Sequence, residues 1–322
     1  MTSTLAATAA ESESLPHRRV LTVDGNSLAH RAWHALNGEQ LDGPWVAHGI
    51  IGMIATAQER VGADRLAVAF DDTDNRRREL DESYKAHRDR KPDEFYSQLG
   101  TAREVLAGAG VPVTVEAGWE ADDVLAAAAR SADALATPLT ILSSDKDLMA
   151  LASDYVTMLR IRRSASDLVA YDPARVAEEF AIPEGTYRQF AALRGDPSDG
   201  IAGVTGIGPK AASKILTTYG SVDAAYAAVT DGDTRLAAGV RKKLVAGIDD
   251  YRRSLALMTP ADEVTFDLER LADFDADAAV ERWSELGLRA ASRRFARAWS
   301  GDAPPENAPA SNEPSWDDDT SF

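Results

Sequence analysis

The 322-residue chain contains no cysteine, so it offers neither disulfide bonds nor thiolate metal ligands. No apolar run approaches the roughly 18 residues of a membrane-spanning helix. The first 19 residues lack the basic stretch and apolar core of a secretory signal. Histidine is scarce, at five residues. These absences argue against a disulfide scaffold, a membrane protein and a zinc site, and they favour a cytoplasmic protein.

Positive charge is also in short supply, because the chain carries a net charge of −17. A strongly acidic chain is the opposite of a typical nucleic-acid binder. Residues 1–17 and 301–322 hold eight of the 52 acidic residues and none of the 35 basic ones, which leaves −9 on the body. The body can therefore approach nucleic acid only if many of its acids face cations.

Short β-branched apolar runs alternate with helical patterns over the first half of the chain. They predict strands at residues 19–24, 64–71, 111–116, 138–145 and 155–161. The alternation predicts an α/β fold with a mostly parallel central sheet flanked by helices. We expect an α/β core at residues 18–172 and a helical region at 173–300. The ends, 1–17 and 301–322, are expected to be a loose lead-in and a disordered acidic tail.

Acidic residues recur where the predicted strands end, and ligands of open parallel sheets bind beyond those ends. Like charges gathered there need a hard divalent cation with oxygen ligands. Taken singly, each acid could equally be a turn or helix cap, but the joint pattern favours two or more Mg²⁺ or Mn²⁺ ions. The nine acids are Asp24, Asp71 and Asp145 at strand ends, Asp147, then Glu120, Asp122 and Asp123 at a helix start, and Asp196 and Asp199 in the turn "RGDPSDG".

Residues 74–91 form a densely charged segment with seven basic and five acidic side chains. Within it, Tyr84 is followed by Lys85, and Arg88 comes three residues later. Cations that track phosphate, next to a ring that stacks on a base, suit single-stranded nucleic acid. The alternative is a solvated helix with charge pairs along its face, which composition alone favours.

A glycine-rich turn precedes a predicted helix in "GVTGIGPKAASKIL". Backbone N–H groups at such a helix start can bind phosphate without reading sequence. The alternative is a tight helix–turn–helix that binds nothing. The candidate DNA-binding residues here are Gly203, Gly206, Gly208, Lys210 and Lys214.

Together and in this order, five stretches resemble the 5′ nuclease family, which includes the nuclease domain of bacterial DNA polymerase I and the flap endonucleases. They are "VDGNSLAHRAWHAL", "FDDTDNRRRELDESYKAHR", "GWEADDVLA", "SSDKDLMAL" and "GDPSDGIAGVTGIGPKAASKIL", between about residues 19 and 300. The resemblance implies a PIN-like fold with a helical arch at about 74–95 and a helix–three-turn–helix at about 195–220. Gly200 departs from the family, since many relatives have Asn there, but the carboxylate of Asp199 is kept.

The resemblance also implies roles for the candidate residues. One metal cluster matches Asp24, Asp71, Glu120 and Asp122, and the other matches Asp145, Asp147, Asp196 and Asp199, with Asp123 beside them. Lys85 and Arg88 match the basic pair at the foot of the arch that contacts the scissile phosphate. Tyr84 matches an aromatic that can stack on substrate. Residues 203–214 match the motif that holds the duplex backbone, often with a bound K⁺.

The implied activity is structure-specific 5′-3′ exonuclease and flap endonuclease cleavage by a two-metal mechanism, in replication and repair. Expected substrates are DNA with 5′ flaps, nicks, gaps or free 5′ ends, and RNA primers paired with DNA. Because no polymerase sequence follows residue 322, we expect a free-standing, monomeric nuclease.

Two other functions compete with this one. A non-catalytic binder of branched DNA would share the fold but lack a complete metal centre. A phosphatase of the haloacid dehalogenase type also places Asp at the end of its first strand, but it needs a second Asp where this chain has Asn26.

The chain ends in "SWDDDTSF". This sequence resembles the acidic tip of bacterial single-stranded-DNA-binding proteins, which docks into pockets on partner proteins. It is therefore a candidate contact for a replication protein. The alternative is a solubilising tail.

Overall fold

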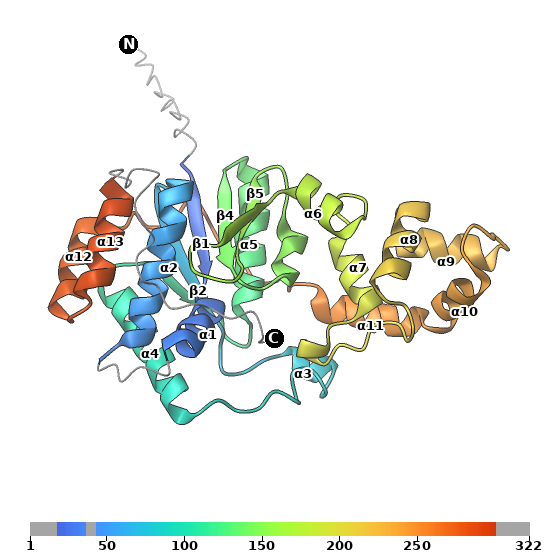
Figure 1. Ribbon diagram of the computed structural model, residues 1–322, viewed down its shortest axis with the longest axis horizontal. Coiled ribbons are helices and arrows are strands. Elements are labelled where there is room, and N and C mark those ends of the chain that lie inside the picture. Colours follow the sequence, from blue (N-terminus) through green and yellow to red (C-terminus); the bar gives the residue numbers. More distant parts are fainter. Residues whose placement is uncertain (1–17, 37–42, 301–322) are drawn as a thin grey trace, which may run out of the picture.

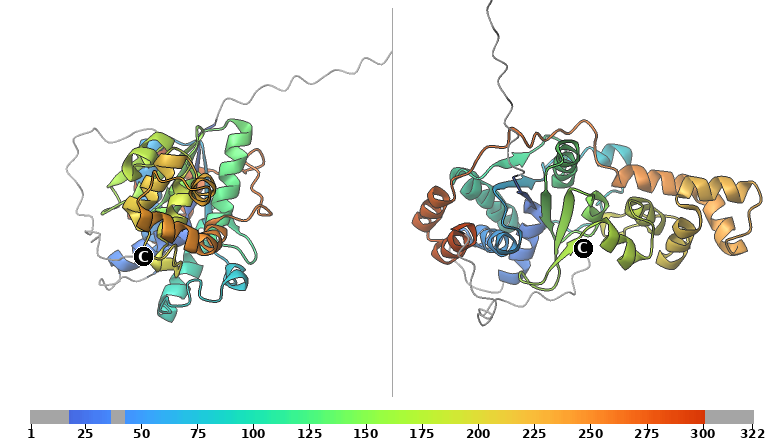
Figure 2. Two further views of the ribbon diagram at one scale, coloured as in Figure 1. Left: turned by 90° about the vertical axis from the view of Figure 1, so that its right-hand side faces the viewer. Right: turned by 90° about the horizontal axis from the view of Figure 1, so that it is seen from above.

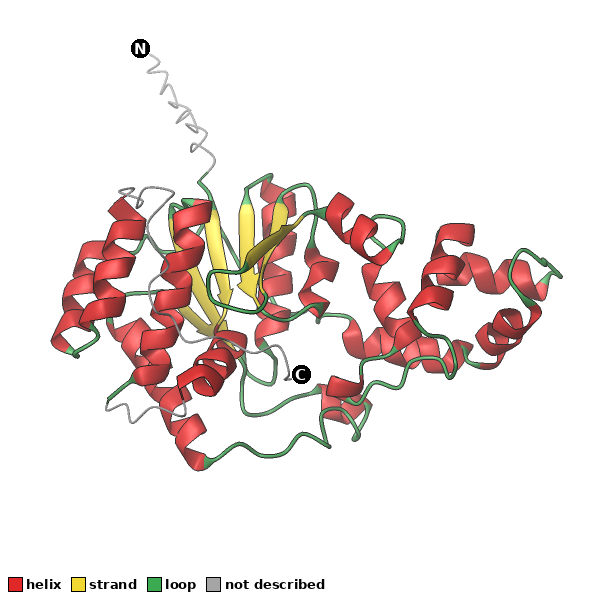
Figure 3. Cartoon of the chain, viewed as in Figure 1, coloured by secondary structure: helices red, strands yellow, loops and turns green. Residues whose placement is uncertain are grey.

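A computed structural model of the protein describes residues 18–36 and 43–300. Its centre is a six-stranded sheet, drawn in yellow in Figure 3, with strand order β3-β2-β1-β4-β5-β6. The strands are β1 (Val20–Asp24), β2 (Arg65–Phe70), β3 (Val113–Val115), β4 (Leu139–Ser143), β5 (Val156–Ile161) and β6 (Leu168–Tyr171). All neighbouring pairs are parallel except β5 with β6. The prediction of a mostly parallel α/β sheet is confirmed.

The central strand β1 is buried along its whole length, as expected of a strand covered on both faces. Its side chains alternate between two apolar cores: Leu21 and Val23 face one, and Val20 faces the other. In register, Val20 lies opposite both Arg65 and Leu139. The carboxyl ends of β1, β2 and β4 therefore lie at one edge of the sheet.

Helices cover both faces of the sheet. One face packs on α1 (Gly25–Leu36), α2 (Trp45–Val61) and α4 (Asp93–Gly108), and the other packs on α5 (Ala121–Leu135). Helix α2 has eleven buried residues because it lies between the sheet and a further helix. After β4 the chain forms the 3₁₀ turn η1 (Asp147–Leu151).

A second group of helices projects from one side of the sheet (Figure 1, right; Figure 2). These elements are α6 (Pro173–Phe180), α7 (Tyr187–Arg194), η2 (Pro197–Asp199), α8 (Pro209–Tyr219), α9 (Val222–Thr230), α10 (Ala238–Ala246) and α11 (Ile248–Met258). Their apolar side chains join the core on the α5 face of the sheet.

The last two helices, α12 (Ala276–Glu285) and α13 (Arg289–Ser300), return to the opposite end of the molecule, where α13 packs on α2 and α12 packs on α13. Trp283 is fully buried there, and its indole N–H donates to the backbone oxygen of Val105 at 3.1 Å. The expected helical region at 173–300 thus consists of two groups of helices in different places. An amphipathic pattern shows that a helix has a buried face, but not which surface buries it.

The segment from residue 74 to 95, expected to be a helical arch, contains the four-residue helix α3 (Arg77–Leu80), then turns, then the start of α4. Lys85 has a left-handed backbone with φ of 54°, which interrupts any continuous helix. In this conformation the segment is a loop with one short helix.

Sequence patterns missed β6, an edge strand in which two of four residues, Leu168 and Tyr171, are buried. No helix in the described part of the chain is long and apolar enough to cross a membrane.

Candidate active site

Two strand-end aspartates are fixed by hydrogen bonds from neighbouring elements. Asp24, at the end of β1, accepts from the backbone N–H of Ser27 at 2.9 Å and from the Ser143 hydroxyl at 2.7 Å. Asp71 follows β2 and accepts from the Asn26 amide at 2.7 Å and from the N–H of Ala121 at 2.8 Å. These hydrogen bonds hold both carboxylates in place without neutralising their charge.

Burial makes ionisation of these acids unfavourable. It raises the pKa of Asp24 to about 7, with further contributions from the charges of Asp71 and Asp145. The pKa of Asp71 rises to about 6 through burial and the charge of Glu120. Burial and acidic neighbours likewise raise the pKa of Asp122. At neutral pH this edge of the sheet therefore holds negative charge that the protein itself offsets incompletely.

A second group of acids lies next to the first. Burial raises the pKa of Asp147 well above its usual value, with added repulsion from Asp145, Asp196 and Asp199. One oxygen of Asp147, Oδ1, is buried without a hydrogen-bond partner within the described residues. The N–H of Asp147 donates to Asp145 at 2.8 Å, so the two side chains are linked through the backbone.

Asp196 differs from its neighbours because cations and hydroxyls surround it. Burial would raise its pKa, but Ser198 and Lys146 lower it below the ordinary value. The Lys146 ammonium lies 3.2 Å from Oδ2 of Asp196, and Arg194 lies 3.7 Å from the same oxygen. Sequence reasoning passed over these two basic residues.

The basic pair Lys85 and Arg88 lies directly on the carboxylates. The Lys85 ammonium is 2.5 Å from Glu120 and 3.8 Å from Asp199. Arg88 pairs with Asp199 and donates to the backbone oxygen of Ser198 at 3.0 Å. Burial would raise the pKa of Glu120, but Lys85 and Arg77 lower it. The arch segment thus joins the two groups of acids.

The eight acids other than Asp123 form one connected cluster, but across the described ranges no three of them converge in the arrangement of a metal site. The donors suit a hard cation: all are carboxylate oxygens, most have raised pKa values, and Oδ1 of Asp147 accepts no hydrogen bond from the described residues, with Arg194 4.0 Å away. In this structure Lys85 and Arg88 supply positive charge to two of these acids, Glu120 and Asp199. A cation held by Glu120 or Asp199 would therefore have to displace these two basic side chains.

Asp123 corrects a sequence-based prediction. It is fully buried, and its two oxygens accept a bidentate pair of hydrogen bonds from Arg77, each at 2.7 Å. The same oxygens accept from the N–H groups of Ala261 and Glu120 at 2.9 and 3.1 Å. With both oxygens occupied, Asp123 holds α5 to α3 and to the segment after α11 instead of binding metal.

Tyr84 is buried in this structure, whereas stacking on a substrate base requires an exposed ring. Its side chain is 4% exposed, and its hydroxyl donates to Glu120 at 2.8 Å. Burial raises its pKa above the usual range. In this conformation Tyr84 orients Glu120, and its ring meets a substrate base only if the arch segment moves.

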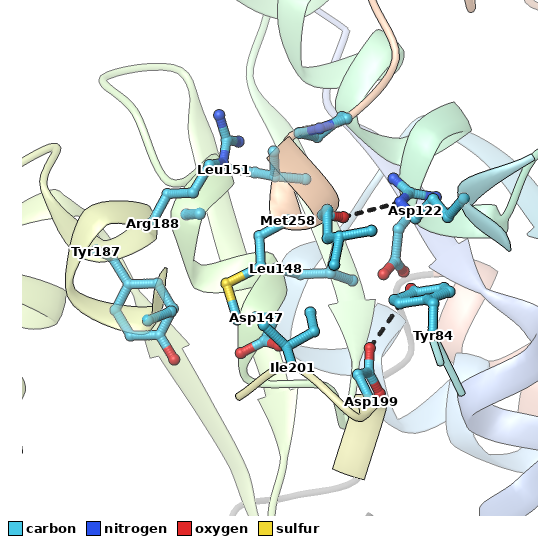
Figure 4. A pocket seen from close by; sticks show the side chains of 15 residues that line it. Tyr84, Asp122, Asp147, Leu148, Leu151, Tyr187, Arg188, Asp199, Ile201 and Met258 are labelled. Carbon is cyan, nitrogen blue, oxygen red and sulfur yellow. Dashed lines mark hydrogen bonds between the residues drawn. The ribbon is translucent and has the colours of Figure 1, made fainter. Parts of the chain in front are cut away.

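An apolar pocket opens beside the acids (Figure 4). Tyr84 and Asp122 lie on one side of it, Tyr187 lies on the other, and side chains such as Met258 lie between them. The Tyr187 hydroxyl is buried and has no hydrogen-bond partner among the described residues. This pocket belongs to the site of the acids, because Asp122, Asp147 and Asp199 form part of its wall.

The predicted phosphate-binding turn joins α7 to α8. Gly203 is buried with φ of 64°, and a Cβ there would lie 2.3 Å from the backbone nitrogen of Gly195. Gly206 and Gly208 are exposed. Pro209 begins α8, and Lys210 and Lys214 are exposed on it one turn apart. Gly203 thus shapes the turn, while the other predicted residues are accessible to a ligand.

Sequence reasoning also missed residues that support the site. Asn26 both donates to Asp71 and accepts from its N–H at 3.1 Å. Arg77 is the buried member of three consecutive arginines. The Lys243 ammonium of α10 donates to the backbone oxygen of Gly206 at 2.9 Å. Only Asn26 had a local signal, two residues after a strand-end aspartate.

Two family models match consecutive parts of the chain. The 5′-3′ exonuclease N-terminal resolvase-like domain matches residues 19–181, and the 5′-3′ exonuclease C-terminal SAM fold matches residues 182–279. The chain is 34% identical over 265 residues to a 5′-3′ exonuclease of Mycobacterium tuberculosis, which covers 75% of this chain and 82% of that protein. It is 33% identical over 294 residues to DNA polymerase I of Mycobacterium bovis. That match covers 87% of this chain but 32% of the polymerase, so the chain spans about a third of such relatives.

Solved structures show the same fold. The bacteriophage T5 5′-exonuclease with bound zinc has a TM-score of 0.63 and 22% identity, covering 89% of this chain and 100% of that one. The bacteriophage T5 flap endonuclease, solved with DNA and metal ions, has a TM-score of 0.63 and 21% identity, covering 88% and 100%. At these identities the likeness concerns the fold alone.

Proposed function

Because the chain belongs to the 5′-3′ exonuclease family, we propose that its carboxylate edge hydrolyses phosphodiester bonds in DNA that carries a free 5′ end or a 5′ flap. The observation that carries the proposal is the cluster of acids around Asp24, Asp71 and Asp147, whose pKa values are raised by burial and mutual repulsion. Divalent cations can neutralise such a cluster and at the same time attract the negative charge of a phosphate.

Two groups of residues would hold the cations. One consists of Asp24, Asp71, Glu120 and Asp122, and the other of Asp145, Asp147, Asp196 and Asp199. Two Mg²⁺ or Mn²⁺ ions bound there would activate a water and stabilise charge on the phosphate. The protein fixes the ligands: Ser143 holds Asp24, and Asn26 holds Asp71.

Lys85 and Arg88 are proposed to exchange partners. Without metal they pair with Glu120 and Asp199. When cations bind those acids, the two basic side chains become available to a phosphate at the same place. Preorganised cations facing the phosphate stabilise the charge that develops on it.

The turn between α7 and α8 is proposed to hold the duplex backbone. The exposed start of α8 offers N–H groups, and Lys210 and Lys214 add positive charge beside them. We also propose that this turn binds a K⁺ ion.

RNA primers paired with DNA, nicks and gaps are proposed as further substrates. The protein is proposed to act as a monomer in the cytoplasm. The proposed replication-protein contact of residues 314–322 lies outside the described residues.

The test uses Asp145→Asn and Asp147→Asn with a 5′-flap substrate and Mg²⁺ or Mn²⁺. We expect both variants to lose most cleavage while gel shifts show flap binding close to wild type, because binding relies on other elements. Asp154→Asn, at an exposed position away from the acids, serves as a control for the change of charge. Wild-type cleavage rates in both site variants would contradict the assignment.

The same assay decides against a non-catalytic binder of branched DNA, which would bind the flap but leave it intact with every metal. The phosphatase alternative is wrong, since both family models describe exonuclease domains. Asn26, at the place where that phosphatase needs its second Asp, instead fixes Asp71.

A further inference from the structure

Gly200 lies at the point where the arch segment meets the turn that carries Asp199. It follows η2 in a left-handed conformation, with φ of 75°. A Cβ atom at position 200 would lie 2.8 Å from the backbone oxygen of Ser83 and 3.3 Å from Nδ1 of His87. The first distance is shorter than real Cβ atoms show, so a side chain here would push one of the two segments away. Glycine at position 200 therefore allows the arch segment to approach this turn as closely as it does.

Two main-chain oxygens of the turn hold the approaching segment. The backbone N–H of Lys85 donates to the oxygen of Asp199 at 2.9 Å, and Nε of Arg88 donates to the oxygen of Ser198 at 3.0 Å. We call residues 83–88 the latch segment. These hydrogen bonds fix its backbone and one of its side chains to the turn, and neither of them involves a carboxylate.

The latch segment also buries an aromatic ring. Tyr84 and Ile201 are 4% and 3% exposed, and they form a small apolar cluster with Leu257 of α11. The Tyr84 hydroxyl donates to Glu120 at 2.8 Å and lies 3.5 Å from Asp199 (Figure 4). Removing the ring from this cluster would expose apolar surface to water, so the cluster stabilises the closed position of the segment.

The closed latch segment places two positively charged groups directly on the acids. The Lys85 ammonium lies 2.5 Å from Glu120, and Arg88 forms an ion pair with Asp199. A divalent cation that binds either acid competes with these groups. Such a cation therefore binds more tightly when the segment is open, and by thermodynamic linkage its binding favours opening.

Other features of the latch segment favour its opening. Lys85 has φ of 54°, a left-handed conformation that costs free energy in residues other than glycine. Ala86, His87 and Arg88 are exposed, so the outer side of the segment faces solvent. The closed position is thus held by a limited number of contacts, which metal binding can oppose.

We propose that the latch segment is an autoinhibitory device, which Gly200 allows to close over the acids and which divalent cations open. This proposal rests on the proposed nuclease function and describes its regulation. In the closed position, the protein's own positive charges offset Glu120 and Asp199. The apparent affinity for divalent cations is then lower than that of the open site, in proportion to the fraction of molecules that are open. Gly200 sets that fraction through its contact with Ser83.

The test compares two glycine substitutions in the full chain. Gly200→Asn adds a Cβ at the contact with the latch segment, while asparagine tolerates the left-handed backbone. Gly185→Asn is the matched control, because Gly185 has φ of 73° and a Cβ there would meet no atom within 4 Å. Both variants place a similar demand on the backbone, and they differ in the contact. Thermal unfolding checks that both fold as the wild type does.

Two readouts follow the latch segment without DNA. The first is trypsin cleavage in EDTA, with mass spectrometry to quantify cuts after Lys85 and Arg88, which require the segment to leave the protein surface. The second is Mn²⁺ binding, measured by electron paramagnetic resonance. For Gly200→Asn we expect faster cuts at both sites and Mn²⁺ binding that is tighter by about tenfold, the change expected if the open form rises from about a tenth of the molecules to nearly all. Gly185→Asn should match the wild type in both readouts.

Tyr84→Ala opens the latch segment by a second route. It removes the ring from the cluster with Ile201 and the hydrogen bond to Glu120. Because Tyr84 lies outside the helices and strands, this change leaves the two large apolar cores intact. It should shift both readouts in the same direction as Gly200→Asn, and it decides the question if Gly200→Asn does not fold.

Unchanged trypsin cuts and unchanged Mn²⁺ affinity in a folded Gly200→Asn variant would overturn the proposal. So would a change in one readout alone, or weaker Mn²⁺ binding, because opening of the segment would then not be linked to access of cations to the acids. Failure of the nuclease function would appear elsewhere. The wild type would then bind Mn²⁺ and a 5′ flap but leave the flap uncut, while the two latch readouts kept their predicted values.

Discussion

At the scale of single residues, the acids at the sheet edge are held in a state that favours protonation. The folded-state pKa values of Asp24 (about 7) and Asp71 (about 6) lie above the ordinary value of 3.8. Folding therefore takes up protons in this range. The contribution of these groups to stability is complete below about pH 4 and is lost as the pH rises to about 7.

This sign gives a prediction for the metal-free protein. In EDTA, the melting temperature should fall between pH 5 and pH 8, and Asp24→Asn should weaken that fall because its side chain cannot ionise. At pH 7.5, Mg²⁺ should raise the melting temperature of the wild type more than that of the variant, since metal binding keeps the carboxylates deprotonated. Identical pH slopes for the two proteins would contradict this account of Asp24.

Arg77 is the residue on which the local structure depends most. It forms paired hydrogen bonds with Asp123, contacts Glu120 at 3.1 Å and donates to the backbone oxygen of Leu257 at 3.0 Å. Removing one partner of a buried pair leaves the other charge without compensation, at a cost of about 3–5 kcal/mol. We expect Arg77→Met to lower the free energy of unfolding, measured with urea, by about that amount.

The neighbouring Arg78 provides a matched control, because it is exposed. Arg78→Met should change the free energy of unfolding by less than about 0.5 kcal/mol. If the two variants were equally stable, the buried arginine could not have the structural role described for it.

At the scale of elements, the turn between α7 and α8 depends on a close approach of two backbone segments. An alanine at position 203 would need a left-handed conformation and would bring its Cβ into the backbone of Gly195. Strain of this kind costs about 1–3 kcal/mol. We expect Gly203→Ala to lower stability by at least this much and to weaken binding of duplex DNA, measured by gel shift.

Gly208→Ala is the control for this change. Gly208 has φ of −91°, and a Cβ there would meet no atom within 4 Å. Its backbone N–H is retained, so stability and duplex binding should stay close to wild type. Equal weakening by both substitutions would show that the shape of the turn is not what Gly203 provides.

The sequence predicts a feature well when neighbouring residues determine it, and poorly when contacts between distant segments determine it. The strand-end acids could be predicted, because parallel strands end at one edge of a sheet. Asp123 and Arg77 could not: nothing in three consecutive arginines shows which one turns inward, and a helix-start acid looks the same whether it meets a metal or a guanidinium. The burial of Tyr84 could not be predicted either, since its hydrogen bond to Glu120 depends on how the arch segment folds back.

At the scale of the whole molecule, charge is arranged in zones that the net value conceals. Acids gather at one edge of the sheet, and exposed basic side chains lie on α8 at one end and on α13 at the other. The sequence pattern shows that α12 and α13 are helices, but not that α13 returns to α2 with α12 packed on it, because that depends on the fit of Trp283 and Phe295 to the core.

The central claim is that the carboxylate edge cleaves DNA at a 5′ end or flap when divalent cations are bound. The most direct measurement is product mapping with the wild-type chain and Mg²⁺ or Mn²⁺ on a 5′ flap, a nick and an RNA-primed duplex, each labelled at the 5′ end. We predict metal-dependent release of the flap as a short oligonucleotide cut near the junction, and of short products from the nicked and primed 5′ ends. Intact substrate at every metal concentration, with normal DNA binding, would contradict the account.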